Sequence, residues 1–178
     1  GYGTPRMTVG SGGDIDVETG DIFFSTAGKG IVLGATSNTA ANTLEDYEEG
    51  TFTPTIQYAS AGNSSFGYSA QVGHYVKVGD IVHVQAQARL NAFSKGTGSG
   101  QVQFAGLPFT AHNGGGYAHG AINVWYYSQT FSGVPIALVI DNTQYIELST
   151  MSSNAATATV ADPDSDSFIS ISGTYRAS

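Results

Sequence analysis

Residues 81–90 alternate strictly between apolar and polar side chains, and this period of two constrains the fold more than any other feature. The apolar positions are Val82, Val84, Ala86, Ala88 and Leu90, and the polar ones are His83, Gln85, Gln87 and Arg89. This alternation predicts a strand with one buried and one solvated face. Further strand candidates are 51–58, 66–78, 101–106, 117–128, 134–140, 144–150, 155–160 and 167–175. Short strands at such regular spacing predict an all-β, antiparallel sandwich with a jelly-roll-like arrangement.

Turn residues define the connections between several of these strands. Val78-Gly-Asp-Ile81 and Ile140-Asp-Asn-Thr-Gln144 fit tight hairpin turns. One short helical turn is expected in 44–49, because Thr43 is a suitable N-cap and Gly50 a suitable C-terminal stop.

The first 34 residues have a different sequence pattern, in which very short apolar segments are separated by glycine. Strand candidates here are 6–9, 14–18, 21–24 and 31–33. Each buries too little apolar surface to offset the entropy of ordering its backbone, about 1 to 2 kcal/mol per residue. We therefore expect residues 1–42 to be a β-rich stalk and linker that folds only by pairing with copies of itself, and 43–178 to be the head. The apolar residues expected to form the stalk core through this pairing are Ile15, Val17, Ile22, Phe23 and Ile31.

Composition excludes several classes of function. Charged residues make up 11% of the 178 residues, and the net charge of −8 opposes binding to nucleic acid. The absence of cysteine excludes disulfides and thiolate metal sites. The apolar run at 134–140 is far shorter than the about 18 residues of a membrane span, so no membrane insertion is expected. The opening residues resemble no leader sequence, and we interpret the chain as the carboxy-terminal part of a longer protein.

Aromatic residues are the most promising binding candidates. Trp125, Tyr126 and Tyr127 are consecutive in a predicted strand, so their rings point to alternate faces. The further candidates, near loops rich in Gly, Asn and Ser, are Tyr58, Asn113, Tyr117 and His119. Such rings stack on the C–H groups of sugars while uncharged side chains bond the hydroxyls. The alternative is that these rings fill the core or a subunit interface.

Signals for metal binding or catalysis are weak. Asp162, Asp164 and Asp166 resemble the start of a calcium loop, but Ser167 and Gly173 replace the Gly and Glu that an EF-hand requires. His74 and His83 lack a third ligand, and there is no nucleophile elbow or phosphate loop. The sequence therefore predicts no cofactor, no metal and no enzymatic activity.

Three strings in the head resemble a known family. They are Thr43-Leu-Glu-Asp-Tyr-Glu-Glu-Gly-Thr-Phe-Thr-Pro-Thr-Ile56, Gly73-His-Tyr-Val-Lys-Val-Gly-Asp-Ile-Val-His-Val84 and Gly106-Leu-Pro-Phe109. This part of the chain is similar to the carboxy-terminal head module of bacteriophage tail fibres and tailspikes. Upstream, Arg6-Met-Thr-Val9 and Gly28-Lys-Gly-Ile31 resemble the stalk repeats of such fibres. Phe52 departs from the tryptophan that is common in the family, and His74 from a small residue.

The resemblance implies a homotrimer with an intertwined stalk and a β-sandwich head. Such a protein is carried on the virion with upstream fibre or tail proteins, and its head binds a bacterial surface polysaccharide or outer-membrane receptor during adsorption. Two alternatives remain at this point. The chain is a trimerisation and folding module of a tailspike whose enzymatic domain lies upstream, or it is a glycan hydrolase or lyase with sites shared between chains.

Overall fold

The computed structural model describes residues 7–17, 19–34, 37, 43–44, 46–115, 120–127, 133–151 and 162–178. All regular structure among them is β, so none of the described segments is a helix able to span a membrane. The chain divides into two compact units, Gly1–Glu45 and Asp46–Ser178. The boundary predicted from the sequence lies after residue 42.

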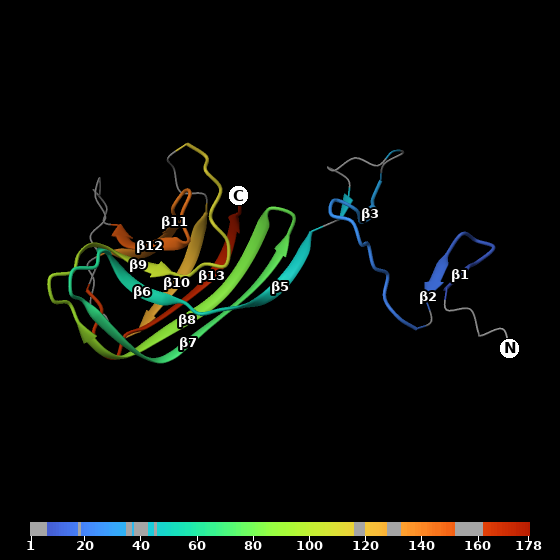
Figure 1. Ribbon diagram of the computed structural model, residues 1–178. Coiled ribbons are helices and arrows are strands. Elements are labelled where there is room, and N and C mark those ends of the chain that lie inside the picture. The colour runs from blue at the N-terminus through green and yellow to red at the C-terminus, as the bar shows by residue number, and fades with distance from the viewer. Residues whose placement is uncertain are drawn as a thin grey trace. The chain divides into compact units, whose positions relative to one another are not determined.

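The N-terminal unit contains two small antiparallel pairs (Figure 1). Strand β1 (Met7–Val9) pairs with β2 (Ile15–Val17), and β3 (Ile31–Val32) pairs with β4 (Thr43–Leu44). The turn between β1 and β2 is closed by hydrogen bonds from Gly10 N to Asp14 O and from Gly13 N to Gly10 O, at 2.8 and 2.9 Å. The predicted strand at 21–24 is wrong for the single chain, because Gly20 at φ 107° turns the backbone and no described segment pairs with it.

The C-terminal unit, which we call the head, is one antiparallel sheet of nine strands in the order β5-β7-β8-β13-β10-β11-β12-β9-β6. Its strands are β5 (Tyr47–Phe52), β6 (Thr55–Ser60), β7 (Ser65–Val78), β8 (Ile81–Ser94), β9 (Ser99–Ala105), β10 (Ala121–Tyr127), β11 (Val134–Val139), β12 (Tyr145–Met151) and β13 (Phe168–Arg176). Most of the predicted strands are confirmed within a few residues at their ends. The candidate at 155–160 lies outside the described residues.

Two predictions in the segment that opens the head are wrong. Residues 47–52 form strand β5 instead of a helical turn, because all six pair with 73–78 of β7. That ladder satisfies more backbone groups than a single capped turn does. The predicted strand at 51–58 is interrupted at Thr53 and Pro54, where the chain passes from one end of the strand order to the other.

The sheet is curled, and β10 belongs to both of its halves (Figure 1). The first two residues of β10 pair with β11, whereas Asn123–Tyr127 pair with β13. The two halves of the sheet share one core, to which β8 contributes every apolar residue of the alternating segment, at 6% exposure or less. The predicted two-faced strand is therefore confirmed. Both predicted hairpin turns are also confirmed, with Gly79 at φ 59° and Asn142 at φ 56°.

Two side chains of β7, the second strand in the order, bond to residues in and next to β6, the last strand. The Tyr68 hydroxyl accepts a hydrogen bond from Ile56 N at 2.7 Å and donates one to Ile56 O at 3.1 Å. The Gln71 amide donates to Pro54 O at 2.7 Å. Two side chains thus hold the β6 edge to β7, where no backbone ladder is present.

Replacing Tyr68 by phenylalanine is expected to lower the free energy of unfolding by about 1 to 3 kcal/mol, because Ile56 N and O both lose their partner in a part-buried seam. Tyr47→Phe is the matched control, since that hydroxyl bonds only the exposed Glu49 carboxylate. Urea unfolding at one protein concentration measures both variants. Equal losses in the two variants would contradict the role given to Tyr68.

Alkaline pH is expected to destabilise the head. Burial raises the pKa of Tyr68 and Tyr126 above the usual 10.0, and raises that of Tyr175 to about 12. Above pH 10 the unfolded phenols lose protons that the folded ones keep, so the stability present below pH 10 falls as pH rises through the folded values. Urea midpoints measured from neutral pH upward should therefore decline above pH 10. A flat profile would show that these hydroxyls reach solvent.

Candidate functional site

Four neighbouring strands bring polar side chains together on the outer face of the head. In the register of β7, β8, β13 and β10, His74 lies opposite Gln85, Gln85 opposite Ser172, and Ser172 opposite Asn123. Because side chains alternate across a strand, all four point away from the core. We call this line of residues the histidine row.

A second line runs parallel to the first, two residues further along each strand. Val72 lies opposite Gln87, Gln87 opposite Ser170, and Ser170 opposite Trp125. We call this the tryptophan row. The buried residues between the two rows, such as Ala86 and Ile171, point into the core.

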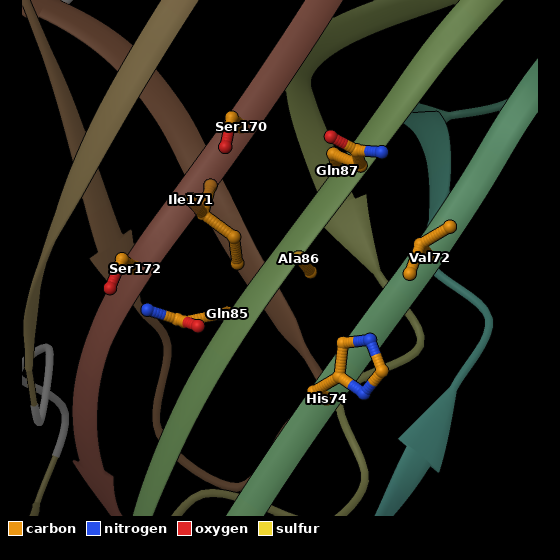
Figure 2. Close-up of a pocket in the computed structure, with 8 residues that line it drawn as sticks. All are labelled: Val72, His74, Gln85, Ala86, Gln87, Ser170, Ile171 and Ser172. Carbon is orange, nitrogen blue, oxygen red and sulfur yellow. The ribbon is translucent and has the colours of Figure 1, made fainter.

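The two rows border a shallow depression of about 360 Å³ (Figure 2). The side chains around it are Val72, His74, Gln85, Gln87, Ser170 and Ser172, with Ala86 and Ile171 at its base. Figure 2 shows the Gln85 amide beside its register partner Ser172, and the His74 ring across β8 from them. No carboxylate, lysine or arginine lines the depression. Its polar groups are therefore the amides of Gln85 and Gln87, the hydroxyls of Ser170 and Ser172, and the His74 imidazole.

The polar side chains of the depression make no hydrogen bond to the part of the chain that the structure describes. This holds for His74, Gln85, Gln87, Ser170 and Ser172. Other glutamines of the head are engaged, since the Gln57 amide donates to Gln103 at 2.8 Å and the Gln144 amide to Leu107 O at 3.1 Å. Two amides, two hydroxyls and an imidazole are thus available to bond a ligand.

Trp125 stands at the β10 end of the tryptophan row with 57% of its surface exposed. Its ring contacts Phe168 edge to face, with centroids 5.3 Å apart and planes at 71°. An edge contact of this kind fixes the orientation of the indole while leaving ring surface accessible. Trp125 is the predicted binding residue that the structure places beside the depression.

The other predicted binding residues are distributed differently. Tyr126 faces inward and packs against the core, and Asn113 is exposed in a loop where its side chain accepts a bond from Gly115 N at 3.3 Å. Tyr117 and His119 lie outside the described residues, as does the side chain of Tyr127. Neither Tyr126 nor Asn113 therefore joins Trp125 on the surface beside the depression.

The expected exposure of Tyr58 is wrong, because its side chain is 2% exposed. The ring packs in an aromatic cluster with Phe66 and Phe93, at centroid distances of 5.9 and 6.4 Å. Its hydroxyl donates to Asp162 Oδ1 at 2.9 Å. Burial, and then this bond, raise the pKa of Tyr58. Tyr58 is a core residue that anchors a loop.

The predicted cation candidates lie in the loop that precedes β13. Both oxygens of Asp162 are engaged, one by Tyr58 and the other by Lys95 Nζ at 2.6 Å. The backbone N of Asp164 donates to Ser167 Oγ at 2.7 Å. Across the described ranges, no three His, Cys, Asp or Glu side chains gather as a metal site. Asp162 thus fixes the loop to the head.

Most of the residues around the depression were not predicted from the sequence as binding residues. The outward side of residues 81–90 was visible in the alternation, which includes Gln85 and Gln87. The alternation of Ser170 and Ser172 with Ile169 and Ile171 is a second signal of the same kind. The pairing of β13 with β8 cannot be read from these patterns. Only this pairing joins the glutamines of β8 and the serines of β13 into one surface.

No family model, no curated protein and no solved structure matches this chain. The resemblance to tail-fibre heads therefore stays a prediction, which rests on the strings between residues 43 and 109.

Proposed function

We propose that this chain is the end of a bacteriophage tail fibre whose head binds a glycan on the bacterial surface during adsorption. The observation that carries the proposal is the exposed Trp125 beside five polar side chains that lack hydrogen-bond partners in the described protein. An indole face stacks on the C–H groups of a sugar, and uncharged amides and hydroxyls bond its hydroxyl groups. The strings that resemble tail-fibre heads supply the biological setting, which is the virion at the host surface.

The proposed activity is binding without catalysis. Glycoside hydrolysis commonly requires two carboxyl groups on either side of the scissile bond. None of the side chains around the depression is acidic. A glycan held there meets hydrogen-bonding groups and an aromatic ring, which suit recognition.

We further propose that the fibre end is a homotrimer with an intertwined stalk and a jelly-roll-like head. Apolar side chains of the N-terminal unit support the stalk, since Ile15, Ile22 and Ile31 are 50% exposed or more and Phe23 is 85% exposed in the single chain. Val17 is partly buried. Three copies around one axis would cover these groups, and threefold repetition would strengthen weak glycan binding by avidity.

A second candidate function is that of a trimerisation and folding module of a tailspike. It is favoured by an exposed apolar patch on the head, formed by Tyr47, Val78 and Ile81, which lie opposite one another on β5, β7 and β8. Such a patch suits contact with another copy. The two candidates differ in whether the assembled head also binds a glycan.

A printed array of purified bacterial O-polysaccharides and capsular polysaccharides distinguishes these candidates. The intact, fluorescently labelled chain is expected to bind one or more of the neutral polysaccharides. A trimeric protein that binds none of them would contradict receptor binding and favour the assembly module.

A further inference from the structure

We infer that the glycan lies on the outer face of the sheet and crosses β7, β8, β13 and β10, with Trp125 as its stacking platform at the β10 end. This inference rests on the proposed function and adds the place, the direction and the charge class of the ligand. It differs from the expectation that residues near polar loops, such as Asn113, would make the contacts.

The direction follows from where the unpartnered groups lie. Gln85 and Ser172 stand side by side in the histidine row, and Gln87 and Ser170 in the tryptophan row. Neighbouring strands are about 4.8 Å apart, close to the length of one pyranose unit in an extended glycan. A chain that crosses the strands therefore meets one side chain of each row per sugar unit, and in the histidine row each of these is polar. From β7 to β10 the face spans about 14 Å, room for about three units.

Trp125 determines which end of this surface contributes most to affinity. Its register partner is Ser170, so a sugar stacked on the indole lies next to the depression. Phe168 holds the ring edge-on, which reduces the conformational entropy lost on binding. Aromatic anchors that are rigid before binding commonly dominate the energy of an interface.

The charge class follows from the residues that are absent from the lining. An anionic sugar in the depression would exchange its hydration for amides, hydroxyls and the His74 imidazole, without a lysine or arginine partner. The net charge of −8 adds long-range repulsion of a polyanion. Arg89 lies in the row beyond Trp125, opposite Phe168, and is the cation that an acidic ligand would use. We therefore assign the site to a neutral polysaccharide.

The test measures binding of the intact chain and its variants to the polysaccharides of the array, and then titrates oligosaccharides cut from one that binds. Trp125→Ala is expected to weaken binding about tenfold or more, with partial recovery in Trp125→Phe. Gln85→Ala and Ser172→Ala should each weaken it about threefold or more. Arg89→Gln and added salt should leave it unchanged if the ligand is neutral.

Trp125 also provides a direct readout, because it is the single tryptophan of the chain. Its fluorescence should change on titration with the same saturation curve as the binding signal. Asn113→Ala is the matched loop control and should bind like the unaltered protein. Thermal unfolding and solution mass show that each variant still folds and assembles, as expected for positions that are exposed or, at Ser172, half-buried.

Each outcome has a separate meaning. If the intact chain binds the array but Trp125→Ala binds equally well and the fluorescence does not respond, the assigned place is wrong while glycan binding stands. Loss of binding in Asn113→Ala alone would move the site to the loop. Binding that needs Arg89 and weakens in salt would overturn the neutral class. No binding by the intact chain would overturn both this inference and the proposed function.

Discussion

Replacing Phe104 by alanine is expected to lower the free energy of unfolding of the head by about 3 to 5 kcal/mol. Phe104 is fully buried on β9, between its register partners Ile56 of β6 and Ile146 of β12. Truncation removes its apolar surface from the core and leaves a cavity where three strands meet. Guanidinium unfolding measures the loss at one fixed protein concentration, because assembly links stability to concentration.

The control for this variant is Phe104→Leu, which keeps most of the side-chain volume and should lose clearly less stability. A loss in Phe104→Ala of under about 1 kcal/mol would contradict a core shared by the two halves of the sheet.

Placing aspartate at both Val78 and Ile81 is expected to dissociate the proposed trimer. These residues are 46% and 47% exposed in the single chain and lie opposite each other beside Tyr47. If another copy covers them, the variant buries two carboxylates without partners. The concentration at which half of the trimer dissociates should rise about a hundredfold or more, as measured by analytical ultracentrifugation.

Ala59→Asp with Ser60→Asp is the matched control, since it adds the same charge at exposed positions on β6. This control should remain trimeric. If both double variants keep the same mass as the unaltered chain, the apolar patch is not a contact between copies.

The strands of the head could largely be predicted from the sequence because each carries its own alternation. Burial of Tyr58 could also have been predicted, since it shares the inward face of β6 with Ile56. This alternation is a stronger indication of burial than the proximity of Tyr58 to a polar loop is of exposure. Strand β5 could not be predicted locally, because its partner β7 begins thirteen residues after it ends and the capping residues Thr43 and Gly50 favour a turn.

The candidate site was only partly predictable for a related reason. Trp125 could be identified from residue type, and the outward side of β8 from its period of two. Their union into one surface depends on β13, which inserts between β8 and β10 in the strand order. Pairings between segments so distant in sequence are a property of the whole core, and no short pattern encodes them.

The proposed homotrimer underlies both the stalk and the avidity of the head, and the solution mass of the intact chain tests it most directly. Light scattering over a range of concentrations is expected to give three times the mass of one chain. A folded monomer over that range would leave Phe23 and its apolar neighbours in water, and would contradict a fibre end built from three copies.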